Sequence, residues 1–242
     1  MTTTDTFTDA ERAAFSRATT ASLTAQLIKR GLRTRAIAHI APVNPATARF
    51  WGPAYTLRYI PAREDLANGA SMGDPENPQR KSIEVCPPGH VIVADTHGCD
   101  VSGTFGDILV ARLRVRGVAG IVSDGPMRDV AELSRMDFPV FARGNAAPPS
   151  YGSMMAVDAQ VPIGCGGVAV FPGDIVIADS DGVVILPRAI AFEIARDAAE
   201  QDRLEAFIRQ KVEGGASIVG VYPPGEALKA EYRDWLASRG EV

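Results

Sequence analysis

Residues 103–129 read GTFGDILVARLRVRGVAGIVSDGPMRD, and this stretch decides the fold. A glycine-rich loop opens an amphipathic helix that we expect from about Gly106 to Arg116. Gly117 is a natural stop for it, because glycine readily adopts the left-handed conformation that ends many helices. The apolar run Val118–Val122 follows and is typical of a buried parallel strand.

A second apolar run, Val91–Ala94, precedes this stretch. The order is therefore strand, loop, helix, strand, loop, and a right-handed crossover makes the two strands parallel neighbours. Both loops then leave the sheet at the same carboxyl edge. Open α/β sheets usually bind their ligands at that edge.

The two loops carry complementary polar groups. The first begins a helix with free N–H groups around Gly106, Asp107, Ile108 and Leu109, which is a ready site for an anion. The second turns at residues 124–126 and presents a guanidinium and a carboxylate side by side, Arg128–Asp129. Together they could hold a small anionic substrate and a divalent cation. The alternative is that Arg128 and Asp129 form only an ion pair at a helix start.

Composition limits the classes of protein. The chain has 242 residues, enough for one large domain or two small ones, and its net charge of -4 argues against a nucleic-acid partner. No apolar run approaches the roughly 20 residues that span a membrane. The first residues lack the basic and apolar regions of a signal peptide, and the three cysteines have no metal-binding spacing. We expect a cytoplasmic protein without a membrane partner.

We expect the whole chain, residues 1–242, to form one domain with helices at both ends. The N-terminal helix, about 8–31, packs on the core or lies across a neighbouring subunit, and the C-terminal helical extension covers about 189–242, with helices at 189–212 and 226–238. Residues 61–81 are polar and form either a lid or a solvated loop. Short strands are expected at residues 34–40, 52–60, 138–141, 154–157, 161–163, 168–171, 175–178 and 183–186.

One sequence layout occurs twice. Residues 88–98 and 172–182 each contain a Pro-Gly turn, an apolar strand and an Asp-containing turn, which predicts two structurally similar strands. Two copies are too few for a solenoid. His97 ends the first copy, where it is either a wall of the site or a hydrogen-bonded loop residue.

The motifs resemble those of the RraA-like family, which includes the 4-hydroxy-4-methyl-2-oxoglutarate aldolases. The resemblance rests on Gly106-Asp107, on Gly-Val-Ala-Gly at 117–120 and on Asp-Gly-Pro-Met-Arg-Asp at 124–129, and it extends from about Gly52 to Leu186. Twenty residues separate Asp107 from Arg128-Asp129, as in the family's metal-dependent pyruvate aldolases. The resemblance implies an α/β fold of three layers, β/β/α, of the swivelling-domain type, with a central βαβαβ run and flanking terminal helices.

The resemblance also implies a site and an assembly. Asp129 would serve the metal, Arg128 would contact the keto acid, and the amides of residues 106–109 would hold its carboxylate. Asp107 would contact metal-bound water, so Arg128 and Asp107 are the expected catalytic residues. The metal would be Mg²⁺, with Mn²⁺ as an alternative, and the protein would be a homotrimer or homohexamer.

The expected activity is cleavage of a 4-hydroxy-2-oxo acid to pyruvate and a carbonyl product, with oxaloacetate decarboxylation as a side activity. Two alternatives stay open. Other family members regulate ribonuclease E by binding it, and a lyase or hydratase acting on another sugar-derived 2-oxo acid would need a similar site. The presence of Asp107, Arg128 and Asp129 together favours an enzyme over the regulator, but the sequence does not separate such a lyase or hydratase from an aldolase.

Overall fold

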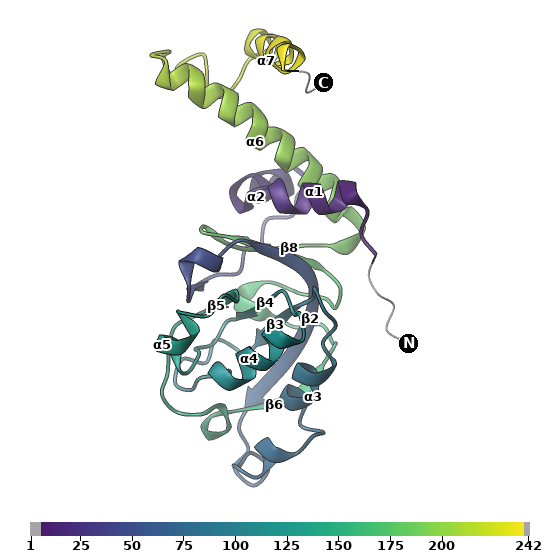
Figure 1. The fold of residues 1–242 in the computed structure, drawn as a ribbon, viewed down its shortest axis with the longest axis vertical. Coiled ribbons are helices and arrows are strands. Elements are labelled where there is room, and N and C mark those ends of the chain that lie inside the picture. Colours follow the sequence, from purple (N-terminus) through teal and green to yellow (C-terminus); the bar gives the residue numbers. More distant parts are fainter. Residues whose placement is uncertain (1–5, 240–242) are drawn as a thin grey trace.

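The structure is a computed structural model that describes residues 6–239, and it has a mixed α/β fold (Figure 1). One curled sheet of eight strands has the order β1-β5-β4-β3-β2-β7-β8, and β6 pairs with β2 beside this path. The strands are β1 Ala41–Pro42, β2 Phe50–Pro61, β3 Val91–Asp95, β4 Gly120–Ser123, β5 Val140–Ala142, β6 Met154–Ala159, β7 Ile175–Asp179 and β8 Gly182–Leu186.

Strand β2 joins the two parts of the sheet. Its first residues pair antiparallel with β7, from Phe50 opposite Ala178, and its middle pairs parallel with β3, from Ala54 opposite Val91. Its last residues pair antiparallel with β6. The sheet curls at β2, so that its two parts face each other.

The predicted βαβαβ run is confirmed. Strands β3, β4 and β5 are parallel neighbours in chain order, joined by α4 Asp107–Val115 and α5 Val130–Leu133. Gly117 has φ +73°, which is the left-handed conformation expected just after α4. The loops that follow β3, β4 and β5 therefore lie at one edge of the sheet.

Three apolar clusters define the layers. The first lies between the parallel strands and the helices α3 Pro78–Val85 and α4, and includes Leu57, Ile83 and Leu113. The second lies between the parallel strands and the β7–β8 hairpin, and includes Val93 and Val176. Together these clusters form the β/β/α core. The third cluster packs the terminal helices on the outer face of the hairpin.

The predicted N-terminal helix is two helices, α1 Asp9–Arg17 and α2 Thr20–Lys29. The backbone becomes extended at Ala18, and Thr19 caps the second helix. The carboxylate of Asp202 holds this break, because it accepts 2.8 Å hydrogen bonds from both the N–H and the hydroxyl of Thr19. The expectation of one continuous helix was therefore wrong.

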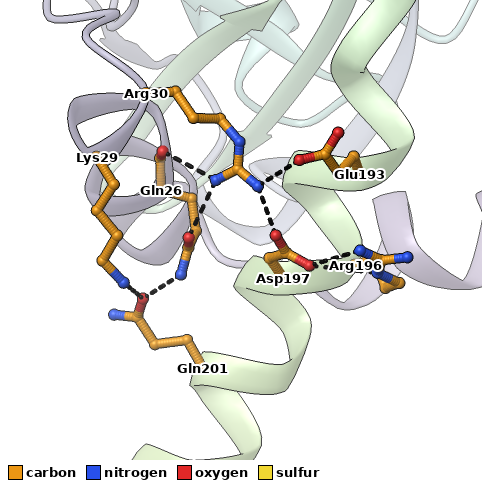
Figure 2. Close-up of polar contacts among 7 residues, drawn as sticks. All are labelled: Gln26, Lys29, Arg30, Glu193, Arg196, Asp197 and Gln201. Atoms are coloured by element: carbon orange, nitrogen blue, oxygen red, sulfur yellow. Dashed lines mark hydrogen bonds and ion pairs between the residues drawn. The ribbon is translucent and has the colours of Figure 1, made fainter.

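Helix α2 is tied to the long helix α6 Ala191–Glu213 by a polar network (Figure 2). The guanidinium of Arg30 reaches Glu193 at 2.8 Å and Asp197 at 2.5 Å. Beside this pair, Gln26 donates to Gln201 at 2.7 Å. The network fixes the C-terminal end of α2 against α6.

Helix α6 continues past the sheet, and α7 Glu226–Ser238 packs at its far end (Figure 1). Both C-terminal helices agree with the sequence prediction. The ring of Phe207 in α6 packs at a tilt against those of Tyr232 and Trp235 in α7, at centroid distances of 5.6 and 5.5 Å. This small apolar cluster is separate from the core. No helix in residues 6–239 combines the length and apolarity needed to cross a membrane.

Other expected elements were shorter or different. Residues 34–40 form only a bridge from Ala36 to Val184, and the two strands expected around Gly164 reduce to a bridge between Ile163 and Val170. The segment 61–81 ends inside α3, which begins with Pro78 behind the cap Asn77.

The repeated layout is confirmed at the two strands β3 and β7. The last residue of each strand is an aspartate whose carboxylate accepts a 3.0 Å hydrogen bond from the N–H two residues later: His97 donates to Asp95, and Asp181 donates to Asp179. The Pro-Gly turns before the strands have glycines with φ +76° and +84°. The two copies lie in different parts of the sheet.

Candidate functional site

Three loops interlock at the carboxyl edge of the parallel strands. Gly103 N–H donates to Pro148 O at 2.9 Å, Thr104 N–H donates to Pro126 O at 2.9 Å, and Met127 N–H donates to Gly144 O at 3.0 Å. These backbone hydrogen bonds fix the loops after β3, β4 and β5 against one another. Residues that are far apart in sequence thereby line one region.

Two glycines allow Arg128 and Asp129 to approach the start of α4. A Cβ on Gly103 would lie 2.2 Å from Arg128 Cγ, and a Cβ on Gly106 would lie 2.5 Å from Asp129 Oδ2. Neither position tolerates a side chain without movement of its neighbour. The predicted spacing of twenty residues therefore corresponds to contact between the two loops.

The charged groups of Arg128 and Asp129 are unpaired among the described residues. Within residues 6–239, no hydrogen bond or ion pair joins the guanidinium of Arg128 or the carboxylate of Asp129 to another side chain or to the backbone. Arg128 is half-buried and Asp129 is exposed. The alternative of a simple ion pair between them is therefore not what the structure has.

The start of α4 offers unpaired N–H groups. Gly106 is the N-cap and provides no side-chain cap. Asp107 Oδ1 accepts from the N–H of Ile108 at 2.7 Å, whereas the N–H groups of Gly106, Asp107 and Leu109 donate to no described residue. The first N–H groups of a helix lack intrahelical partners and favour anions. The amides of Gly106, Asp107 and Leu109 remain available to an anion; that of Ile108 is already engaged.

Asp129 adopts a left-handed backbone conformation, with φ 55° and ψ 37°. Few residues other than glycine adopt it, although aspartate is among the more tolerant. Asp129 is the N-cap of α5, yet its side chain makes no capping hydrogen bond there. The conformation instead lets the carboxylate lie beside Gly106.

Asp124 holds the site together and was not singled out from the sequence. Its buried carboxylate accepts from the N–H and the hydroxyl of Thr96 at 2.7 and 2.8 Å, and from the N–H groups of Gly98 and Gly166 at 3.2 and 3.1 Å. Four donors satisfy a buried carboxylate. An aspartate directly after a buried strand was the available signal.

His97 precedes Gly98, one of the donors to Asp124, and is a loop residue. Its N–H donates to Asp95, its backbone has φ 55°, and its side chain is exposed. No hydrogen bond from its imidazole to another described residue is present. The structure therefore favours the loop interpretation over the wall of a site.

The segment before α3 reaches the site through Gln79. The buried side-chain amide of Gln79 donates to Thr104 O at 2.6 Å, and Thr104 is the neighbour of Gly103. Two of the segment's carboxylates pair on the surface, Asp65 with Arg63 and Glu76 with Lys81. The segment therefore borders the site, while these two carboxylates form ion pairs on the surface of the segment.

The described part of the site has two carboxylates that could bind a metal. That of Asp129 is unpaired, whereas Oδ1 of Asp107 already accepts a hydrogen bond from a backbone N–H. No group of three or more His, Cys, Asp or Glu side chains within residues 6–239 is arranged to hold a metal ion. Mg²⁺ commonly takes only one or two carboxylates and completes its shell with water and substrate. The donor set thus fits Mg²⁺ better than Zn²⁺, which prefers several protein ligands.

Comparison with known proteins agrees with the fold. A protein of Pseudomonas syringae pv. tomato is 25% identical with a TM-score of 0.76 over 89% of this chain and 98% of that one. Streptomyces coelicolor RraAS2, described as an unusual member of the RNase ES inhibitor RraA family, is 30% identical with a TM-score of 0.74 over 85% and 98%.

A curated relative from Halalkalibacterium halodurans, provisionally named a 4-hydroxy-4-methyl-2-oxoglutarate aldolase, is 36% identical over 45% of this chain. The match spans 51% of that relative, about half of its length. A relative from Xanthomonas campestris with the same provisional name is 35% identical over 60% of this chain and 80% of its own. The family model described as RraA-like, Aldolase/RraA, matches residues 9–185, and the chain belongs to the RraA-like family.

Proposed function

We propose that this protein is a divalent-metal-dependent aldolase that cleaves a 4-hydroxy-2-oxo acid to pyruvate and a carbonyl compound. One observation carries the proposal: an unpaired guanidinium and an unpaired carboxylate, Arg128 and Asp129, lie against the uncapped start of α4. The provisional names of two relatives give it further support.

Each part of the site binds a different group of the substrate or the cation. The free amides at the start of α4 receive the substrate carboxylate, with help from the helix dipole. Arg128 binds the 2-oxo acid through its planar fork. Asp129 holds Mg²⁺ or Mn²⁺, and when bound the cation supplies Lewis-acid polarisation of the 2-oxo group.

Cleavage breaks the C3–C4 bond. The electron pair of this bond stays on the three-carbon fragment as the enolate of pyruvate, the 4-hydroxyl loses its proton, and C4 becomes a carbonyl carbon. Arg128 stabilises the negative charge that grows on the enolate oxygen. Asp107 orients the water that takes the hydroxyl proton, and protonation of C3 completes pyruvate.

The same enolate forms when oxaloacetate loses carbon dioxide. We therefore expect oxaloacetate decarboxylation as a side activity that uses the same residues. The reaction needs no 4-hydroxyl proton transfer, so it depends on Arg128 and Asp129 more than on Asp107.

Regulation of ribonuclease E by binding is the second candidate, because RraAS2 is described as a member of the RNase ES inhibitor RraA family. A binding role needs a surface and does not need free Arg128 and Asp129. A lyase or hydratase acting on another 2-oxo acid is the third candidate. Its product would differ from pyruvate plus a carbonyl compound.

A screen of 2-oxo acids for pyruvate release tests the proposal. After exhaustive chelation activity should vanish, and added Mg²⁺ or Mn²⁺ should restore it. A lysine adduct trapped by borohydride, or full activity without metal, would point instead to a Schiff-base aldolase. The four lysines of the chain, Lys29, Lys81, Lys211 and Lys229, are the residues to examine for such an adduct.

A further inference from the structure

The second half of α6 and the helix α7 form an arm that projects from the body of the molecule (Figure 1). The first turns of α6 pack on the β7–β8 hairpin, where Ala195 and Ala198 are buried. Beyond them, the described part of the arm buries four apolar residues, Phe207, Ile208, Leu228 and Tyr232. Ile218 and Val219, in the connection between the two helices, are 56% and 83% exposed. The arm therefore presents apolar side chains that its own small core does not cover.

A groove of about 570 Å³ lies along the arm, next to the start of α2 and the turn of the hairpin. Its apolar wall includes Ile208 and Val212 of α6 and Ile218 and Tyr222 of the connection. A cavity of roughly 150 Å³ holds a group the size of benzene, so the groove has room for several apolar side chains. Exposed apolar surface of this kind often marks an interaction site.

The charged residues around the groove are mostly acidic. They are one arginine, Arg209, and four acids, Asp181, Asp202, Glu205 and Glu213. None of the four carboxylates forms an ion pair within residues 6–239. The hydrogen bonds that Asp202 and Glu205 accept come from uncharged groups, those of Thr19, Ser22 and Gln201. Electrostatic complementarity therefore favours a partner segment that is both apolar and basic.

Helix α4 has an exposed apolar side. Ile108 and Val115 are 78% and 74% exposed. Their spacing of seven residues puts them on the same side of the helix, two turns apart. Val110 and Leu113 are buried on the opposite side, against the sheet. Ile108 and Val115 thus contribute nothing to the core of their own chain.

The same helix is basic in its second half. It has three arginines there, Arg112, Arg114 and Arg116. Glu84 of α3 pairs with Arg112 at 2.7 Å, whereas the guanidinium of Arg114 has no hydrogen bond or ion pair with any residue that the structure describes. Asp107, the acid of α4, lies at the other end of the helix. The outer face of α4 thus combines two exposed apolar side chains with an excess of positive charge.

The arm and the outer face of α4 lie on opposite sides of one molecule. Helix α4 packs on the outer side of the parallel strands, and α6 packs on the outer side of the hairpin. The apolar layer between the strands and the hairpin separates them, and the arm projects away from the body that carries α4 (Figure 1). The arm cannot cover α4 of its own chain, so the matching surface belongs to a second copy.

We propose that the arm of one copy binds the outer face of α4 of the next copy. Ile108 and Val115 enter the groove, and the arginines of α4 lie beside its carboxylates. The two surfaces are different, so the contact is head-to-tail and closes into a ring when the rotation between copies allows it. The contact is independent of the proposed aldolase activity.

Mixing two variants tests the head-to-tail contact. Val115→Asp alters only the face of α4, and Ile218→Asp alters only the groove, so each should lower the mass measured by light scattering. Their equimolar mixture should form dimers, because one intact face and one intact groove remain. Ile28→Asp is the control, since Ile28 is 57% exposed on α2 and lies outside both surfaces. Unchanged masses for both variants, an equal loss in the control, or a mixture without dimers would overturn the proposal.

Charge reversal tests the electrostatic match. Arg114→Glu and Glu213→Arg should each raise the dissociation constant about two- to fivefold at low salt, as exposed charge pairs do, and less at high salt. The double variant should recover part of the loss, because the charges are again opposite. Sedimentation velocity measures all four proteins. No effect of either single variant, or a further loss in the double variant, would contradict the proposed pairing.

A cross-link identifies the two surfaces even if a variant is unstable. In a Cys99→Ser background the remaining cysteines, Cys86 and Cys165, are buried. Val115→Cys chains mixed with Ile218→Cys chains should give a cross-linked dimer with a short bismaleimide, and either chain alone should give none. Dimers from Ile218→Cys alone would show that two arms bind each other, and that result or a mixture without cross-links would overturn the proposal.

Discussion

Gly106→Ala tests the geometry of the site with a single methyl group. The new Cβ would lie 2.5 Å from Asp129 Oδ2, well inside ordinary contact. Gly106 has φ -113° and ψ 178°, which any residue adopts, so the backbone itself is not strained. The substitution should therefore displace the Asp129 carboxylate and leave the fold in place.

The expected magnitudes follow from that contact. Alanine is a poorer N-cap than glycine by about 0.5–1 kcal/mol, and rotating Asp129 away costs about 0.5–1.5 kcal/mol. Together these costs lower the melting temperature by about 2–10 °C in a chain of this size. A carboxylate displaced by about 1 Å should reduce kcat/KM about 100-fold.

Gly225→Ala is the matched control. Gly225 is also an uncapped N-cap with an extended backbone, at α7, and a Cβ there would meet nothing within 4 Å. It should show the capping cost alone, with unchanged turnover and unchanged Mn²⁺ affinity. Scanning fluorimetry, metal titration and pyruvate release compare the two variants.

A double variant checks the cause. With Asp129→Ala, the part of the Gly106→Ala destabilisation that comes from the carboxylate should disappear, because the two residues touch. If Gly106→Ala and Gly225→Ala have the same effects on stability, metal affinity and turnover, the proposed contact does not control the site.

Three further results are expected. Arg128→Lys keeps the charge but loses the planar fork, so the activation barrier should rise by about 2–4 kcal/mol and kcat should fall accordingly. Asp107→Asn should impair turnover but leave pyruvate binding, measured by calorimetry, largely intact. The reverse pattern would exchange the two roles. Burial acts to raise the pKa of Asp197, but hydrogen bonds from Arg30 and Arg196 outweigh it and hold the pKa below its ordinary 3.8, so this stabilisation is present above that pH and is lost as the pH falls through the lowered value. Asp197→Asn should thus lose about 1 kcal/mol in urea unfolding at pH 7 and less at pH 3, with exposed Asp234→Asn as a control; a difference that grows in acid would refute this. Light scattering should give a trimer or a dimer of trimers, and a fully active monomer at micromolar concentration would contradict that.

Local sequence signals predicted the central part of the fold because they act over a few residues. The apolar runs at β3 and β4 and the stop at Gly117 identify the βαβαβ run. The break between α1 and α2 had no comparable signal. It depends on Asp202, which binds Thr19 from 183 residues away. Helix α3 had its signal, Asn77-Pro78, but the surrounding polar composition obscured it.

The candidate site, like the fold, was predicted only in part from the sequence. Asp107, Arg128 and Asp129 follow from spacing, because loops after parallel strands meet at one edge. Asp124 and Tyr59 do not, since their roles depend on partners. Asp124 accepts from four donors and holds the loops together, whereas the buried hydroxyl of Tyr59 has no hydrogen-bond partner among residues 6–239. Only the three-dimensional structure distinguishes these two buried polar residues.

Hydrogen bonding also distinguishes paired charges from unpaired ones at the candidate site. Arg30 and Arg112 are paired with carboxylates, at 2.5–2.8 Å for Arg30 and 2.7 Å for Arg112. Arg128 and Asp129 are adjacent in sequence, and yet their charged side-chain groups form no hydrogen bond or ion pair with a described residue. A half-buried guanidinium without a partner contributes little to stability, and the left-handed backbone of Asp129 adds a cost. A bound ligand would supply the partners that the two charged groups lack, which is the physical reason to propose the chemistry here.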